Sequence, residues 1–430
     1  MVVLAILMSV AAVCDAATLT YPGSAPCNTT LQACITGAAA GDIIQIATNG
    51  PIAETPTIDK SLTVEPATGF APVLNGSLFA FPTGAATITV QGLAINGSFR
   101  AGPGTGDLTV HFLSNHVSIS GDNFAVEVSS GTSPPYGNVT ADIRNNTVAA
   151  TGPAEFCSGI IFGPIEDTGT SSVVIANNTV TVTNCSEGIG ISAVNGPGEA
   201  ASADILANRV DVTGTDDGIE LRNFEQTVGS TLTGRIIDNL VTGQVNVAGF
   251  PGAIVVSADG FEPIQNVQVI NNTVTGNQSG IGLDARTDLG ASITGVVANN
   301  LVANNSNIGL GISPAVEPAV SNNNNLVFGN GSDFFTAGPG TLTQDPRFVS
   351  ASDFHLRPDS PAINRGDNAA VPGDITTDLD GNPRIQFAVV DIGAYEAGQV
   401  AIANIPTVSR LGLLALGVAL ALAAALRLRR

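Results

Sequence analysis

The sequence is short of positive charge. Its 15 lysine and arginine residues stand against 36 aspartate and glutamate residues, so the formal net charge is −21, and Lys60 is the single lysine. A surface this acidic repels phosphate groups, which excludes nucleic acid as a partner of the main body of the protein. The chain also has no tryptophan, three histidines and no Cys-x-x-Cys motif. It therefore offers no zinc site.

Charged residues make up only 12% of the chain and aromatic residues 5%, whereas 44% of the residues are hydrophobic and glycine occurs 49 times. The hydrophobic content is sufficient for a large core and excludes disorder of the whole chain. No stretch between Ile88 and Val327 keeps an apolar period of about 3.6 residues, which excludes crossover helices there. Strands and tight turns suit this composition better than helices.

What the chain does contain is a repeat. An Asn-x-Val unit recurs at steps of 25 to 33 residues, beginning at Asn115, Asn146, Asn178, Asn208, Asn239, Asn272, Asn300 and Asn325. A second unit, Gly-hydrophobic-x-hydrophobic, stays in phase with it and begins at Gly159, Gly188, Gly218, Gly280 and Gly309. Short alternating stretches predict half-buried strands. Strands at this spacing without helices predict a parallel solenoid.

The physics of a solenoid explains the repeated residue types. Neighbouring coils lie about 4.8 Å apart, so equivalent positions touch. We therefore expect the asparagines to hydrogen-bond their side chains up and down the stack as a ladder, while valine and isoleucine stack inward as aliphatic columns.

The Ile-x-Asn-Asn-x-Val and Gly-Ile-x-Ile pattern resembles the repeats of the right-handed, pectate-lyase-like parallel β-helix superfamily. The opening, Leu31-Gln-Ala-Cys-Ile35 followed by Gly41-Asp-Ile-Ile44, is similar to the short amphipathic capping helix and first strand of that family. The resemblance implies an all-β fold: a right-handed parallel β-helix over residues 61–332 after a cap and first coil at residues 17–60. An extended linker is the alternative to the capping helix.

Residues 333–397 resemble the segment called choice-of-anchor Q, which follows β-helices in exported bacterial proteins. The resemblance lies in ordered motifs, among them Asp345-Pro-Arg-Phe348, Ser360-Pro-Ala-Ile363, Asp378-Leu-Asp-Gly-Asn-Pro-Arg384 and Val390-Asp-Ile-Gly-Ala-Tyr-Glu396. Within it, we expect His355 and Tyr395 to be packing residues. The loop that begins at Asp378 is expected to be a turn, since it lacks the acidic residue that would complete a calcium loop.

The two ends of the chain look like targeting signals. The apolar run at residues 2–13, with small residues before Ala17, predicts a signal peptide over residues 1–16, although the usual basic residues are missing. A lipoprotein acylated at Cys14 and a buried first strand are the alternatives.

After a linker at residues 398–404, residues 405–430 combine a short motif, an apolar run and terminal arginines. The motif is Ile405, Pro406, Thr407 and Val408, and the apolar run is Leu411–Leu426. Together they resemble the IPTL-CTERM sorting signal, a relative of PEP-CTERM tails. The resemblance implies a Gram-negative bacterium, export, a C-terminal transmembrane helix in the inner membrane, and an exosortase-like enzyme that releases the protein to the cell surface or the medium. A plain single-pass anchor is the alternative.

Four cysteines remain after the signal peptide, and an even number in an exported protein favours disulfides. Cys27 and Cys34 straddle the start of the expected capping helix. Cys157 and Cys185 lie 28 residues apart, close to one coil. We therefore predict a Cys27–Cys34 and a Cys157–Cys185 bridge, with unpaired buried thiols as the alternative for the second pair.

The candidate site lies where the coils are longest, in loops expected at residues 192–203, 222–234 and 285–295. In the β-helix superfamily such a flank forms the sugar-binding cleft. The expected ligand-binding carboxylates are Asp216, Asp217, Glu220, Asp259 and Asp284. In a lyase, Arg222 or Arg286 would be the catalytic base, while calcium on the carboxylates would acidify the substrate. A solvated set of surface charges is the alternative.

Three functions follow. The favoured interpretation is a non-catalytic module that binds polysaccharide or cell-envelope material. The alternatives are a calcium-assisted polysaccharide lyase, or a hydrolase, and a stalk that holds something away from the membrane. The acidic surface repels polyuronates unless calcium bridges the charges, which favours a non-enzymatic role. No cofactor is required, and calcium is the only one that the sequence suggests.

Overall fold

The computed structural model describes residues 16–121, 123–129, 137–153, 157–163, 170–193, 200–214, 216–225, 229–245, 252–260 and 262–398. The chain divides into two units, Met1–Glu396 and Ala397–Arg430. Most of the predicted signal peptide, almost all of the linker and the whole predicted sorting tail, including its transmembrane helix, lie outside the described residues. Within the described ranges, no helix is long and apolar enough to cross a membrane.

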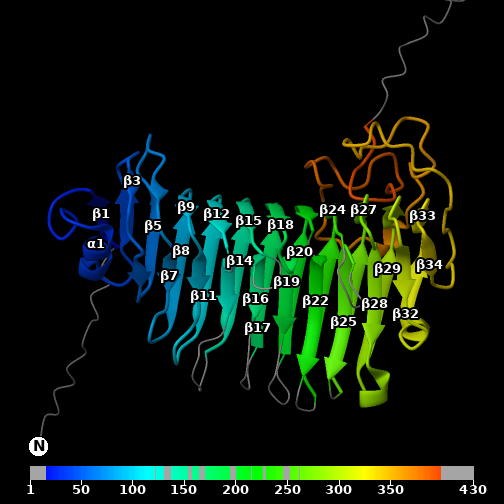
Figure 1. The fold of residues 1–430 in the computed structure, drawn as a ribbon, viewed down its shortest axis with the longest axis horizontal. Helices are drawn as coiled ribbons and strands as arrows, with labels where there is room; N and C mark the ends of the chain where they lie inside the picture. Colours follow the sequence, from blue (N-terminus) through cyan, green and yellow to red (C-terminus); the bar gives the residue numbers. More distant parts are fainter. Residues whose placement is uncertain are drawn as a thin grey trace, which may run out of the picture. The chain divides into compact units, whose positions relative to one another are not determined.

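The described strands form three sheets, in which consecutive coils contribute neighbouring parallel strands (Figure 1). Sheet A has 12 strands: β1 (Thr18–Tyr21), β2 (Ile43–Ile46), β5 (Leu62–Pro66), β8 (Ala86–Gln91), β11 (Leu108–Leu113), β14 (Val139–Arg144), β17 (Thr170–Ala176), β20 (Ala200–Leu206), β23 (Thr231–Ile237), β26 (Ile264–Ile270), β29 (Ser292–Ala298) and β32 (Val320–Asn323).

Sheet B has 11 described strands: β3 (Pro51–Ile52), β6 (Val73–Leu74), β9 (Ala94–Asn96), β12 (His116–Ser120), β15 (Thr147–Thr151), β18 (Thr179–Thr183), β21 (Arg209–Thr213), β24 (Leu240–Thr242), β27 (Thr273–Thr275), β30 (Leu301–Ala303) and β33 (Leu326–Phe328). Sheet C also has 11: β4 (Thr57–Ile58), β7 (Leu78–Ala80), β10 (Phe99–Ala101), β13 (Phe124–Ser129), β16 (Ser158–Gly163), β19 (Glu187–Ala193), β22 (Asp217–Glu225), β25 (Ile254–Gly260), β28 (Ile281–Ala285), β31 (Ile308–Ile312) and β34 (Ser332–Phe334).

The predicted all-β parallel solenoid of the right-handed type is confirmed, with one short α-helix among the described residues. The Asn-x-Val units form sheet B and the glycine units form sheet C. The sequence pattern did not single out sheet A. The loops expected at 192–203, 222–234 and 285–295 were predicted too long, because these ranges contain most of β20, β23 and β29. These strands bury small residues such as Ala201 and Ala203 between polar ones, so their alternation is weak.

The asparagine ladder is present and buried. At Asn208, the side-chain amide donates to Asn239 Oδ1 (3.0 Å) and to the carbonyl of Ile175 (2.9 Å), and the backbone N–H donates to the same Oδ1 (2.9 Å). The equivalent bonds run from Asn115 to Asn325. The ladder therefore satisfies buried polar groups at the corner between sheets A and B.

The residue before each ladder asparagine has a positive φ, for example 59° at Asn145 and 55° at Asn271. Asparagine tolerates this left-handed conformation better than most residues, which explains the Asn-Asn pairs. A second ladder, which the sequence analysis missed, joins Gln244, Asn277 and Asn305 in the last coils.

The first glycine of four sheet C units, at positions 159, 188, 218 and 280, faces the valine column of sheet B. A Cβ at Gly188 would lie 2.6 Å from Val210 Cγ1, and one at Gly218 would lie 2.4 Å from Val241 Cγ1. No side chain fits there, because the aliphatic column of sheet B fills the space. Ile189 is also fully buried. Gly188 and Ile189 therefore both face the core, and Glu187, the residue before the glycine, faces outward.

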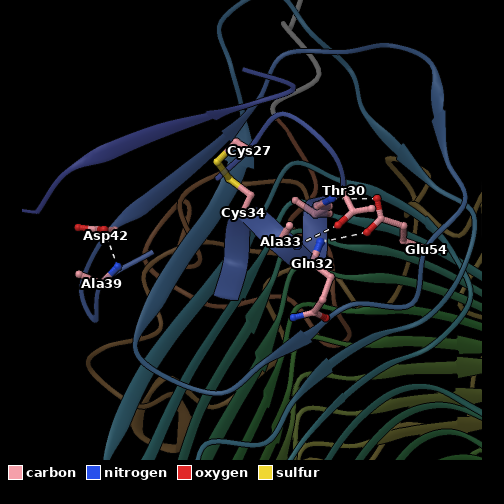
Figure 2. Close-up of a disulfide and its surroundings, with 9 residues drawn as sticks. Cys27, Thr30, Gln32, Ala33, Cys34, Ala39, Asp42 and Glu54 are labelled. Carbon is pink, nitrogen blue, oxygen red and sulfur yellow. Dashed lines mark hydrogen bonds between the residues drawn. A yellow bond between two sulfur atoms is a disulfide. The ribbon is translucent and has the colours of Figure 1, made fainter. Parts of the chain in front are cut away.

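The N-terminal cap has the predicted form, as Figure 2 shows. Helix α1 (Leu31–Gly37) begins after Thr30, whose hydroxyl accepts a bond from Ala33 N (3.0 Å). The Glu54 carboxylate accepts two more of the first N–H groups, those of Leu31 (2.8 Å) and Gln32 (3.0 Å). The Cys27–Cys34 disulfide ties the helix to the preceding turn, and the predicted Cys157–Cys185 disulfide is also present.

After β34 the chain folds back beside β24 and β27, in orange in Figure 1. Three short 3₁₀ helices complete the elements of the described ranges: η1 (Thr287–Leu289), η2 (Glu317–Ala319) and η3 (Asn368–Ala370). Fully buried Arg384 anchors the returning segment: its guanidinium donates to Asp238 of the coil (2.9 Å) and to Glu396 (2.7 Å).

The loop at Asp378 and the rings of His355 and Tyr395 lie in this returning segment. The Asp378 carboxylate accepts bonds from the backbone N–H groups of Asp380, Asn382 and Glu396, so the predicted turn is confirmed. The ring of buried Tyr395 packs 4.2 Å from that of His355, but His355 also bridges two carboxylates, one of them that of Asp380.

Candidate functional site

The candidate residues gather on the outward face of sheet C, where β19, β22 and β25 lie side by side. The register places Glu187 beside Asp217, and Arg222 between Ser192 and Ser257. The outward turn before the interior glycine brings residues at the start of each strand to this face. Four of the expected residues, at positions 217, 220, 222 and 259, thus come together.

Three carboxyl groups form the centre of the site: those of Glu187, Asp217 and Glu220, called the carboxyl cluster below. Glu187 lies over Gly190, since a Cβ at that glycine would be 2.8 Å from Glu187 Oε1. Asp217 Oδ1 accepts a bond from Gly252 N (2.9 Å). A glycine at position 190 therefore makes room for a carboxyl group of the same coil.

The environment favours the protonated form of these acids. Burial, and then the charge of Glu220, raises the pKa of Glu187 to about 7, against a hydrogen bond from Ser158. The same two causes raise the pKa of Asp217 to about 8, although the Gly252 N–H opposes the rise. Burial also raises the pKa of Glu220, which Arg222 lowers in part. Near neutral pH the cluster thus holds both hydrogen-bond donors and acceptors.

Arg222 lies beside the carboxyl cluster and forms ion pairs with two carboxylates. Its Nε lies 3.2 Å from Asp259 Oδ2 and its Nη1 lies 4.0 Å from Glu220 Oε1. A guanidinium group is charged at any ordinary pH and so cannot accept a proton. The arrangement suits an oriented hydrogen-bond donor better than a catalytic base.

The remaining expected residues lie at the edge of the site. Asp284 follows Ser257 in the row of Arg222. Arg286 is exposed and bonded to Asp288, with Nε 3.0 Å from Oδ1, and this hydrogen bond raises the pKa of Arg286, the opposite of what a base requires. Asp216 turns its carbonyl to Gln244 Nε2 (2.5 Å), and its buried Oδ1 has no hydrogen-bond partner within the described ranges.

Sequence reasoning missed Glu187, although a signal for it was present. Glu187 and Asp217 both stand directly before the first glycine of a sheet C unit, so the repeat makes them neighbours on adjacent strands. The sequence also gave no indication that Gly190 leaves space for the side chain of Glu187, three residues earlier in the chain.

In the part of the chain that the structure describes, no group of three or more histidine, cysteine, aspartate or glutamate side chains is placed to hold a metal. Calcium held by carboxylate oxygens therefore stays a prediction from the sequence.

Comparisons with known proteins add little beyond the fold. No family model matches the chain, and no curated protein matches it. The crystal structure of pectate lyase Pel9A is similar, with 14% identity and a TM-score of 0.47, and the match covers 89% of this chain and 98% of that chain. The complex structure of XylC with xylose matches with 8% identity and a TM-score of 0.42, covering 86% of this chain and 96% of that one. Neither likeness is close enough to transfer an activity.

Proposed function

We propose that the protein is an exported module that binds a neutral polysaccharide on the outward face of sheet C, without cleaving it. The observation that carries the proposal is the carboxyl cluster of Glu187, Asp217 and Glu220. Its partly protonated acids offer donors and acceptors together, which is what sugar hydroxyl groups need. The ion-paired Arg222 adds a charged donor in a fixed orientation.

The net charge of the chain favours one class of polysaccharide as the ligand. A net charge of −21 disfavours a polyanionic polymer, and the described residues offer no metal group that would bridge like charges. A neutral glycan loses nothing by approaching this surface. Cell-envelope material that carries neutral glycan fits the same chemistry.

The proposed location follows from the ends of the sequence. Residues 1–16 would direct export, and residues 405–430 would anchor the protein in the inner membrane of a Gram-negative bacterium until an exosortase-like enzyme releases it. The disulfides support an oxidising compartment, because such bonds persist outside the cytoplasm.

The test is retention on immobilised neutral polysaccharides, with new reducing ends and unsaturated sugars followed in the same samples. The wild-type protein should be retained by at least one polymer and should release no product. Asp217→Ala and Glu220→Ala should weaken retention. Asp211→Ala, which removes an exposed carboxylate from sheet B, is the matched control and should change nothing. Loss of retention in all three variants, or in none, would contradict the proposal.

A hydrolase is the second candidate, because a carboxylic acid with a pKa near 7 can protonate a leaving group while a neighbouring carboxylate acts as base or nucleophile. Glu187 and Asp217 meet the first requirement. New reducing ends that disappear in Asp217→Asn would establish this function. A lyase would instead give unsaturated products, and the ion pairs of Arg222 and Arg286 make it the weaker alternative.

A further inference from the structure

Two aromatic side chains stand at the N-terminal end of the outward face of sheet C. Phe79 lies on β7 and Phe81 follows it, with ring centroids 5.9 Å apart and ring planes inclined by 31°. Phe81 is 46% exposed, in a chain in which aromatic residues are scarce. Exposed aromatic side chains in line with a polar site indicate a contact surface.

The register connects this aromatic pair to the carboxyl cluster. Outward-facing residues of successive strands form one row, which consists of Phe79, Arg100, Glu127, Ile161, Gly190 and Glu220. The neighbouring row consists of Phe81, Gly102, Ser129, Gly163, Ser192 and Arg222. The two rows begin at the aromatic pair and end at the site described above.

The second row is free of large side chains between its ends. Gly102, Ser129, Gly163 and Ser192 are all small, and a Cβ at Gly102 would lie 3.5 Å from Phe81 Cε1. The Phe81 ring therefore lies against the backbone of the next coil rather than standing alone. A ring held in this way can carry the apolar face of a sugar.

Between its ends, the first row offers the side chain of Arg100, which is held by buried Glu127. Arg100 forms an ion pair with Glu127, and Ser129 Oγ donates to Glu127 Oε1 (3.1 Å). Charged groups that are already fixed by a partner orient a hydroxyl-bearing ligand without much further loss of entropy. The same kind of ion pair, Arg222 with Glu220, stands at the other end of the row.

We propose that this face binds one extended neutral glycan chain, which stacks on Phe79 and Phe81 and reaches Glu220 and Arg222. The inference rests on the proposed function and specifies its ligand as a long chain rather than a single sugar. From β7 to β22 the sheet order contains five inter-strand steps, which correspond to about 24 Å. A disaccharide is too short to occupy both ends.

The first test measures affinity by calorimetry for cello-, xylo- and malto-oligosaccharides of graded length. Phe81→Ala should weaken binding of long chains by about two- to tenfold and leave disaccharide binding unchanged. Glu220→Ala should weaken binding at every length. Equal losses for short and long chains in Phe81→Ala, or no loss, would overturn the inference, whereas no binding of any probe to the wild type would overturn the proposed function with it.

The second test uses the absence of tryptophan from the chain. Phe81→Trp places a single indole at the expected stacking position, and Phe70→Trp places one at an exposed position between β5 and β6, away from sheet C. A long oligosaccharide should change the emission of the first variant and not of the second. If calorimetry records binding that Glu220→Ala weakens while neither emission changes, the glycan does not reach Phe81 and the inference is wrong, although the proposed function stands.

Discussion

At the scale of single residues, burial decides the chemistry of the site. Glu187, Asp217 and Glu220 share one outward patch, and Glu220 is a cause of the raised pKa of both others. Since three like charges cannot all be desolvated cheaply, the cluster holds protons at a pH where isolated carboxyl groups have lost them. The site thus gains hydrogen-bond donors without any lysine.

This protonation has a consequence for stability. The folded-state pKa of Glu187 is about 7, above the ordinary value of 4.5. Its contribution is therefore fully present below about pH 4.5 and is lost as the pH rises through about 7. Wild-type protein should lose stability between these limits, and Glu187→Gln should reduce the loss by about 2–3 kcal/mol.

Chemical denaturation at about pH 5 and about pH 8.5 measures this difference. The control is Asp211→Asn, which should keep the wild-type profile because Asp211 is exposed on sheet B. A profile of Glu187→Gln as steep as that of the wild type would show that Glu187 is ionised throughout.

The sequence predicted much of this site but missed one of the three carboxyl groups at its centre. Asp217, Glu220, Arg222 and Asp259 come together as expected, because strand register follows from the repeat. Glu187 was missed because its role depends on Gly190, and an absent side chain leaves no signal in a polarity pattern. Arg286 was proposed from its position alone, and its bond to Asp288 depends on the turn at η1, which spacing does not predict.

At the scale of elements, the asparagine ladder holds the coils in register. Asn208 links three coils: it accepts from Asn178, and donates to Asn239 and to the carbonyl of Ile175. The ladder was predictable because the asparagines recur once per coil. Sheet A was not, because small residues such as Ala201, Ala203 and Gly234 stand at some inward positions of its later strands and give little contrast with polar neighbours.

Removal of one ladder residue should be costly. Asn208→Ala leaves the backbone N–H and side chain of Asn178 without their acceptor, in a place that water cannot reach. We expect a loss of about 2–4 kcal/mol in the free energy of unfolding. Asn266→Ala, which truncates an exposed asparagine on sheet A, should cost much less. Equal losses for the two variants would contradict the structural role of the ladder.

At the scale of the described unit, the returning C-terminal segment is fastened by buried charge. Arg384 is 1% exposed and lies between Asp238 and Glu396. Burial raises the pKa of each carboxyl group to about 7, and Arg384 opposes the rise in both. The sequence motifs indicated that this segment folds, but its partner coil could not be read from local patterns, since Asp238 is distant in the chain.

Arg384→Met should release this segment. The change leaves two buried carboxyl groups without their cation, which typically costs about 3–5 kcal/mol. We expect much faster proteolytic cleavage within residues 335–396, while the coils stay resistant. Arg347→Met removes an exposed ion pair with Asp359 in the same segment and should leave the cleavage rate unchanged. Cleavage of Arg384→Met at the wild-type rate would refute the fastening role of Arg384.

The central claim is that the carboxyl cluster holds a neutral glycan through its protonated acids. The most direct measurement is the affinity for the retained glycan between about pH 6 and about pH 9. Because the pKa values of Glu187 and Asp217 are about 7 and about 8, wild-type affinity should fall as the pH rises. Asp217→Asn keeps a donor that does not titrate, so its profile should be flatter. A wild-type affinity that does not depend on pH, or an equally steep fall in Asp217→Asn, would contradict the account.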